Sequence, residues 1–378
     1  MTSILTFKWL WVQDVHFGVT SVPIGAVTAS FKCVYEAAKR RGIKKVVFGG
    51  DTTDRPLSLV NDYASEFIQF IIWLLKDADE NDIEIIIIEG TPGHDWKQAR
   101  LFEQIKKELG LEAKLVYITK LAIIHLEDFG NVLVVPDQWR PNASTTFNEV
   151  LTLLKEKNLT QVDYAFMHGS FKYQVPSFLR NRSDLHEEEE YCRIVKKAIF
   201  IGHEHGYSTY KHIYCAGSLE RTKHGQEEEK GAFFVEEMRS GSLHVEFLRN
   251  SKAQIFKDVF VDGLTSDEIL SRIEDMGVDL EQPANIRLVA MQDAQVVAEF
   301  IKKYKLIYSE IKWSLKNLSS PSEKTDDFQL EQANIEFQKI NLDVGTITSL
   351  LMRRIEDKYP DKSGQIEVLF NETIESNV

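Results

Sequence analysis

The strongest constraint on the fold is a series of short apolar runs that alternate with stretches of helical period. Runs rich in β-branched and aromatic residues predict strands at 6–12, 46–48, 85–88, 132–135, 164–167 and 198–201. Helix-period stretches lie between them, for example at 29–40 and 64–76. This alternation predicts a layered α/β domain over residues 1–250, which two further strands at 232–236 and 244–247 complete.

A different pattern begins near Ile255. It predicts strand, helix, strand, helix and strand in that order, with the second helix signalled by the capping-box residues Thr265 and Glu268. Residues 251–316 are therefore predicted to form a small α+β domain. The polar, aperiodic segment 317–327 indicates a linker, and residues 328–378 are predicted to form a helical tail. An apolar stripe on this tail either packs on its own protein, which is the commoner outcome, or docks a partner; it comprises Val344, Ile347, Leu350, Leu351 and Ile355.

Length, apolar runs and charge limit the class of protein. The 378 residues exceed what one hydrophobic core usually supports, which agrees with more than one domain. The longest apolar stretches fall short of a membrane span and no secretory signal is evident, so we expect a cytoplasmic protein without membrane attachment. Cys33, Cys192 and Cys215 are expected to be buried thiols in a reducing compartment. The net charge of −13 restricts any path for DNA to a local basic region.

Histidine and aspartate residues gather just after the predicted strands. The five segments are Asp14-Val15-His16, 50–55, Gly93-His94-Asp95, His168-Gly169 and 202–205. A single strand-end histidine is more often a structural hydrogen-bonding group, but these segments hold five of the ten histidines. Ligands usually bind where loops leave the carboxyl ends of strands in an α/β sheet. Carboxylate and imidazole together suit Mn, Fe or Zn, so the pattern predicts a catalytic pair of metal ions.

These motifs resemble those of the calcineurin-like metallophosphoesterases, and among them the SbcD-type nuclease subunit of bacterial and phage complexes that process DNA double-strand breaks. The more particular match is the stretch 214–231, which contains Gly217-Ser218-Leu219, then Arg221, and later Glu229-Lys230-Gly231. The alternative is that this stretch is a turn between two strands with a solvated acidic rim. The resemblance implies a β-sandwich flanked by helices, a DNA-capping domain and a partner-binding helical tail.

The resemblance also implies a role for each motif residue. Asp14, His16 and His205 would hold the first metal ion, His168 and His203 the second, and Asp51 would bridge the two ions. His94 would be a catalytic histidine that is not a ligand, and Asp95 would orient its ring. The substrate would be contacted by Asp54, Arg55, Ser218 and Arg221.

The third motif departs from the family pattern. The family usually places an Asn directly before the catalytic histidine, and its amide oxygen binds the second metal ion. Gly93 stands there in this sequence and has no side chain to donate. The Thr91 hydroxyl, a backbone carbonyl or a water could take its place. We therefore expect a second site that binds its metal ion more weakly than the first.

The function implied by the resemblance is hydrolysis of DNA phosphodiester bonds with two divalent metal ions, manganese or alternatively magnesium. The activities would be exonuclease on duplex DNA and endonuclease on single strands or hairpins. The chain would act in double-strand-break repair and recombination as a homodimer bound to an SbcC-type ATPase, forming a heterotetramer. Docking would use the apolar stripe on residues 344–355, and a phage-encoded protein would work in the host cytoplasm.

Two other functions stay open from the sequence. A phosphomonoesterase or cyclic-nucleotide phosphodiesterase would use the same metal ions and suits the charge of −13 better, although the tail argues against it. A non-catalytic scaffold subunit on the same fold is disfavoured by the presence of six ligand-type residues together with His94.

Overall fold

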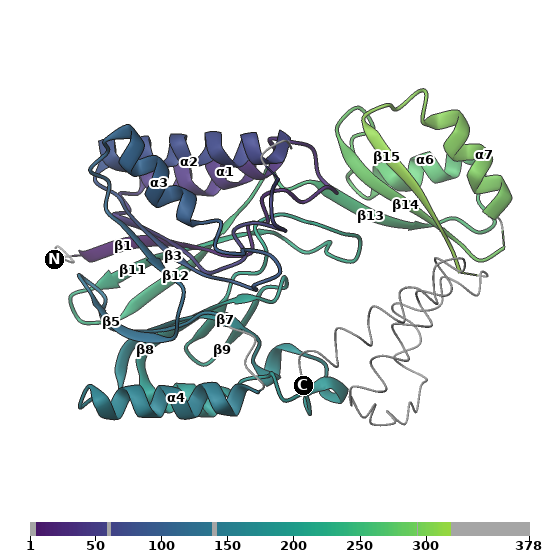
Figure 1. The fold of residues 1–378 in the computed structure, drawn as a ribbon. Coiled ribbons are helices and arrows are strands. Elements are labelled where there is room, and N and C mark those ends of the chain that lie inside the picture. The colour runs from purple at the N-terminus through teal and green to yellow at the C-terminus, as the bar shows by residue number, and fades with distance from the viewer. Residues whose placement is uncertain (1–4, 59–61, 138–141, 293, 319–378) are drawn as a thin grey trace, which may run out of the picture. The chain divides into compact units, whose positions relative to one another are not determined.

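The fold was obtained as a computed structural model, which describes residues 5–58, 62–137, 142–292 and 294–318 (Figure 1). Within these residues the chain is mixed α/β, with two large mixed sheets, a small parallel sheet and seven α-helices. The predicted partner-binding residues 344–355, the tail and most of the linker lie outside the described residues. None of the described helices is long and apolar enough to cross a membrane.

The first sheet is built around a parallel core. Its order is β12 (Leu243–Arg249), β11 (Gly231–Met238), β1 (Leu5–Val12), β2 (Lys45–Phe48), β3 (Glu84–Ile88) and β4 (Leu115–Ile118). Strands β1 to β4 pair in parallel, and β11 and β12 complete the sheet in antiparallel pairing. The carboxyl ends of β1, β2 and β3 therefore meet at one edge, where their loops can share a site.

The second sheet repeats this plan. Its order is β5 (Ala122–Leu126), β6 (Gly130–Val135), β7 (Val162–Gly169), β8 (Val195–His203), β10 (Ile213–Cys215) and β9 (Ser208–Tyr210). Strands β6, β7 and β8 pair in parallel. All six apolar runs predicted as strands from the sequence are strands, and β4, β5, β9 and β10 were missed.

The two large sheets pack face to face. Trp9 and Trp11 of β1 are fully buried between them, and the Trp9 ring lies 4.7 Å from that of Phe200 in β8. Helices cover the outer faces (Figure 1): α1 (Ala26–Arg40), α2 (Asp62–Asn81) and α3 (Arg100–Leu109) pack on the first sheet, α4 (Ala143–Glu156) and α5 (Glu188–Ile194) on the second. Two short 3-10 helices, η1 (Lys172–Gln174) and η2 (Ser177–Leu179), precede α5.

Residues 255–317 form the small sheet with its two helices. The order along the chain is β13 (Ile255–Phe260), α6 (Ser266–Asp275), β14 (Ala284–Ala290), α7 (Ala294–Tyr304) and β15 (Ile311–Asn317), with all three strands parallel. The capping box is present, because the Glu268 carboxylate accepts from Thr265 N at 2.8 Å. It begins α6, the first helix of the series, so its assignment to the second helix was wrong. The division into domains at residues 250 and 251 stays a prediction.

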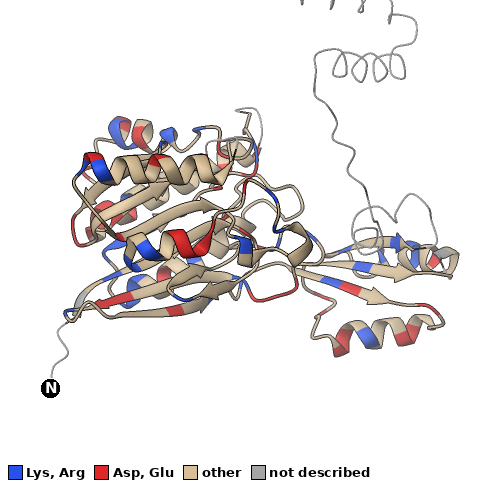
Figure 2. Ribbon diagram, turned by 90° about the horizontal axis from the view of Figure 1, so that it is seen from below, with Lys and Arg blue, Asp and Glu red and all other residues tan. Residues whose placement is uncertain are grey.

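All three cysteines are free thiols, but only Cys215 is buried, whereas Cys33 and Cys192 are half-buried. The expectation of three buried thiols is thus met at one position. Acidic and basic residues are interspersed along the elements (Figure 2).

Candidate metal centre

The loops after β1 and β2 are hydrogen-bonded to each other along their backbones. Gly49 N donates to Val12 O at 2.8 Å, Asp14 N to Gly50 O at 3.1 Å, and His16 N to Asp51 O at 3.0 Å. This pairing extends the strand register past the end of the sheet. It fixes Asp14, His16 and Asp51 side by side at the carboxyl edge.

Four of the predicted ligands have left-handed backbones, which non-glycine residues rarely adopt. The φ angles are 47° at Asp14, 56° at His16, 49° at Asp51 and 103° at His203. Strain of about 1–3 kcal/mol per residue is typical of such positions and is concentrated at functional sites. The strained ligands thus agree with a site whose geometry the surrounding packing enforces.

Two glycines of the motifs allow these loops to approach closely. A Cβ at Gly50 would lie 2.2 Å from His168 Nδ1, and a Cβ at Gly90 would lie 2.1 Å from Asp51 N. Neither position can carry a side chain without moving a predicted ligand. The glycines therefore set how tightly the two sheets' loops converge.

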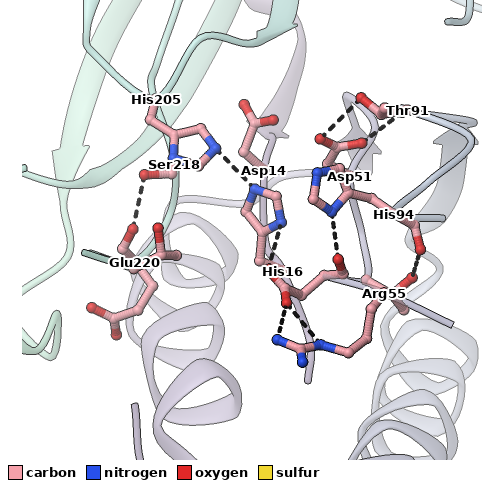
Figure 3. A network of polar contacts seen from close by, with 12 residues as sticks. Asp14, His16, Asp51, Arg55, Thr91, His94, His205, Ser218 and Glu220 are labelled. Atoms are coloured by element: carbon pink, nitrogen blue, oxygen red, sulfur yellow. Dashed lines mark hydrogen bonds and ion pairs between the residues drawn. The ribbon is translucent and has the colours of Figure 1, made fainter. Parts of the chain in front are cut away.

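The first ligand group comprises Asp14, His16 and His205, each with a ligand atom within 4.8 Å of the others. The His16 and His205 rings approach through their Nε2 atoms, which lie 3.0 Å apart, and the ring planes are tilted by 58° (Figure 3). The fully buried Asp14 carboxylate accepts from His203 N at 3.0 Å and from Gln13 Nε2 at 2.9 Å. Side chains from both sheets thus converge on one point.

The second ligand group comprises Asp51, His168 and His203, also within 4.8 Å of one another. His168 Nδ1 lies 2.8 Å from Gly49 O. Because a carbonyl oxygen can only accept, Nδ1 carries a proton and donates a hydrogen bond to it. His168 Nε2 is thereby turned toward Asp51 Oδ1, at 3.2 Å. A backbone hydrogen bond that fixes the ring and its tautomer is usual for metal-binding histidines.

Thr91 lies within the second group. Its hydroxyl oxygen is 3.3 Å from Asp51 Oδ2 (Figure 3). The same oxygen is 3.3 Å from His168 Nε2 and 3.4 Å from His203 Nδ1. Thr91 N also donates to Asp51 Oδ1 at 2.6 Å. The Thr91 hydroxyl thus lies among the ligand atoms of the second group, where it can take the place of the absent Asn side chain.

Burial sets the protonation states of the first group. It raises the pKa of Asp14 to about 7 and lowers those of His16 and His205 to about 4 and about 2. In the second group, burial alone would lower the pKa of His168, but the Asp51 carboxylate raises it to about 10. The first group's imidazoles are thus neutral at pH 7, which is the form that binds metal ions.

The donor set fits metal ions. The ion pairs found among the described residues provide no Lys or Arg for the buried carboxylates of Asp14 and Asp51. Buried carboxylates are costly without a compensating cation. Oxygen and imidazole nitrogen donors on two adjoining groups could therefore each hold a divalent ion.

His94 and Asp95 follow β3, on the loop that carries Thr91. The His94 ring centroid is 5.1 Å from that of His16, and His94 Nδ1 lies 2.5 Å from Asp54 O. The Asp95 carboxylate instead accepts from Thr53 N at 3.0 Å and from Gly90 N at 2.7 Å. The prediction that Asp95 orients the His94 ring was wrong, because the Asp54 carbonyl does this and Asp95 joins two loops.

Comparison with known proteins does not identify a family for this chain. No protein-family model matches the sequence, and no curated protein matches it. One similar solved structure is the crystal structure of TT1561 of Thermus thermophilus, with 12% identity, a TM-score of 0.37, and coverage of 64% of this chain and 98% of that chain. A second has 9% identity, a TM-score of 0.36 and the same coverage. Likeness at these TM-scores carries no argument about this chain.

Ser218 and Arg221 were predicted to contact the substrate, but both are engaged by the backbone. Ser218 is fully buried, and its hydroxyl donates to Glu220 O at 2.8 Å. The Arg221 guanidinium donates to Gln254 O and Glu228 O, both at 2.9 Å. Burial thus corrects the assignment of Ser218, which has no exposed surface to offer, whereas the contact of the half-buried Arg221 with substrate stays a prediction.

Asp54 and Arg55 lie beside the first group. Arg55 Nη2 is 2.6 Å from Asp54 Oδ2, and the other Asp54 oxygen is 3.7 Å from His16 Nδ1 (Figure 3). Asp54 also forms a third group of ligand atoms with His16 and His94. Arg55 is exposed, and the predicted contact of both residues with substrate stays a prediction.

Two glutamines that position ligands were missed. The buried Gln13 donates to Asp14 Oδ2 and accepts from Trp11 Nε1 at 2.8 Å, and Gln226 Nε2 lies 2.7 Å from His205 Nδ1. Adjacency to Asp14 was a signal for Gln13. Gln226 carries no comparable signal, because 21 residues separate it from His205.

Proposed function

We propose that this chain is a two-metal phosphodiesterase of the calcineurin-like class that hydrolyses DNA, as a nuclease subunit acting with an SbcC-type ATPase. The observation that carries the proposal is the convergence of two ligand groups, Asp14, His16 and His205 beside Asp51, His168 and His203. Asp51 acts electrostatically on both, since it raises the pKa of His168 and opposes the lowering of the pKa of His16. A carboxylate that acts on the histidines of both groups is suited to bridge a metal pair.

The architecture supports the class. Two face-to-face sheets with helices on both outer faces are the layering expected of a metallophosphoesterase. The ligands come from loops at the carboxyl ends of β1, β2 and β3 in one sheet and from β7 and β8 in the other. Ligands from both sheets make the site depend on the whole sandwich.

The chemistry divides between the metal ions and the protein. Two bound ions would supply a nucleophile at neutral pH and neutralise the charge of the phosphorane-like transition state. His94 Nδ1 donates to Asp54 O, which leaves Nε2 free to carry a proton toward the leaving oxygen. The exposed Arg55, held by Asp54, can bind a non-bridging phosphate oxygen.

The deciding experiment measures hydrolysis of labelled duplex and single-stranded DNA with Mn²⁺ or Mg²⁺, with and without the ATPase partner. Nitrophenyl phosphate, a monoester, is assayed beside them. We expect metal-dependent cleavage of DNA and little turnover of the monoester. Absence of DNA cleavage under every metal condition would overturn the proposal.

A monoesterase or cyclic-nucleotide phosphodiesterase is the second candidate, favoured by the net charge of −13. In that case the same assay would show monoester or cyclic-nucleotide turnover above that of DNA. The assembly with the ATPase, the homodimer and the cytoplasmic location belong to the nuclease proposal. Deleting the residues after Asn317 should spare metal binding and abolish co-elution with the ATPase.

A further inference from the structure

Trp96 is a large aromatic residue close to the metal centre that the proposed chemistry does not use. It is 63% exposed, whereas Trp9 and Trp11 are fully buried in the core. It stands two positions after His94 on the loop that follows β3. An exposed tryptophan beside a reactive site presents a large apolar surface to solvent, and such a surface is suited to contact a binding partner.

The backbone holds Trp96 in this exposed position. Trp96 and Lys97 are consecutive left-handed residues, with φ angles of 43° and 58°. Lys97 N donates to the Glu89 carboxylate at 2.7 Å, and the other oxygen of this buried carboxylate accepts from Tyr117 Oη. Two strained residues braced by a buried acceptor indicate that the outward position of the indole is enforced, and enforced strain points to a function.

The indole borders a cavity of about 470 Å³, lined by Glu89, Pro92, Trp96, Lys97, Thr119, Lys120 and Asp137. Lys97 and Lys120 are both exposed and bring two positive charges to its walls. Both carboxylates of its lining have partners: Glu89 accepts from Lys97 N and from Tyr117 Oη, and Asp137 is also engaged. Asp137 lines both this cavity and the pocket that contains Thr91, His168 and His203, so the cavity adjoins the second ligand group.

We propose that this cavity is a nucleobase subsite for single-stranded DNA. The base of a nucleotide next to the scissile phosphate stacks on Trp96, and Lys97 and Lys120 contact the neighbouring phosphates. Aromatic stacking is open to any unpaired base, whereas a base within a duplex is already stacked and paired. The subsite therefore favours frayed or single-stranded ends. It rests on the proposed function and adds the part of the substrate that is recognised.

Binding without cleavage tests the subsite directly. A fluorescein-labelled oligothymidylate is titrated in EDTA and followed by anisotropy. Trp96→Ala should weaken binding by about tenfold, as expected for one lost stacking contact, and Trp96→Phe by less. Lys120→Ala should weaken binding and reduce its dependence on salt. Lys114→Ala is the matched control, because Lys114 lies just before β4 and Lys120 just after it; its binding should be unchanged.

Two further measurements keep the outcome clear. Trp96→Asn removes the ring but tolerates a left-handed backbone, so it replaces the Ala variant if that one does not fold. An oligonucleotide with abasic sites should bind the wild-type protein and the Trp96 variants equally. Equal binding of oligothymidylate to wild type and both ring-deleted variants would overturn the subsite.

Failure of the subsite and failure of the proposed function give different results. If the wild type cleaves DNA with Mn²⁺ but Trp96 variants keep the same affinity and KM, the subsite is wrong and the nuclease stands. If oligothymidylate binding depends on Trp96 but no DNA is cleaved with any metal ion, the subsite stands and the nuclease proposal falls.

Discussion

The two ligand groups use the same residue types but differ in protonation. In the first, the Nε2 atoms of His16 and His205 lie 3.0 Å apart, and burial lowers the pKa of His16 to about 4 and that of His205 to about 2. In the second, Asp51 raises the pKa of His168 to about 10 against the effect of burial. The residues around a buried histidine therefore decide whether its ring is neutral and can bind a metal ion directly, or is protonated and must first lose a proton.

The groups also differ in which residues hydrogen-bond to their ligands. The second contains the Thr91 hydroxyl, and its His168 ring is held by the Gly49 carbonyl. In the first, Asp14 accepts from the Gln13 side chain, and the His205 ring is held by the Gln226 side chain. The second group is therefore the one tied more closely to the backbone.

The largest effect should come from Asp51, because it acts on both groups. Asp51→Asn removes the carboxylate that acts on the histidines of both groups, and we expect metal affinity to fall at both sites by more than about 100-fold, beyond the loss typical of a supporting group. Asp14→Asn is the matched comparison and should weaken the first site more than the second, which Asp14 touches only through the backbone N–H of His203. Calorimetric titration with Mn²⁺ measures both. If Asp51→Asn lost only the second site, Asp51 would not bridge the groups.

His94 tests where the first group ends, because its ring also groups with His16 and Asp54. If His94 is a proton donor, His94→Gln should lower kcat by about 10²–10⁴-fold and leave metal content unchanged. Turnover on DNA and metal analysis by mass spectrometry are measured on the same sample. Loss of Mn²⁺ from this variant would make His94 a ligand and enlarge the first group.

The comparison also separates what the sequence could predict from what it could not. Parallel strands place their carboxyl ends at one edge, so residues directly after buried apolar runs had to converge there. Asp14 and Asp51 follow such runs in the first sheet, and His203 ends β8 of the second; His203 contacts Asp14 through its backbone N–H and groups with Asp51. The missed strand β9, Ser208–Tyr210, is short and half-exposed and has no apolar run to reveal it.

Contacts between loops were beyond the sequence. Asp95 was assigned to its neighbour His94, but its carboxylate reaches Thr53 N and Gly90 N on two different loops. Ser218 belongs to the motif Gly217-Ser218-Leu219, but the motif alone does not reveal that its side chain is buried. Such errors share a cause, since partner choice depends on how far loops approach one another and not on adjacency along the chain.

Thr91 tests whether the second group depends on its hydroxyl. Thr91→Val keeps the shape and the backbone bond to Asp51 but removes the oxygen, so the second site should weaken by about 10–100-fold, as for other supporting groups at metal sites. Thr91→Ser keeps the oxygen and is the control. Titration of wild type should show two unequal sites; two sites of equal affinity would contradict the weaker second site expected from Gly93.

The smallest effect is a difference in proton release on metal binding. Below a pKa of about 10, a metal ion must displace a proton from His168 Nε2, so affinity of the second group should rise about tenfold per pH unit. The first group's imidazoles are already neutral, and Asp14, with a pKa of about 7, is mostly ionised at pH 8. Its affinity should therefore be nearly flat above pH 8.

Calorimetry at pH 8 to 9 under nitrogen, in two buffers of different ionisation enthalpy, should find about one proton released at the second site and none at the first. Equal release at both sites would mean that His168 and the first group's histidines do not differ in protonation, and the contrast between the groups would then rest on Thr91 alone.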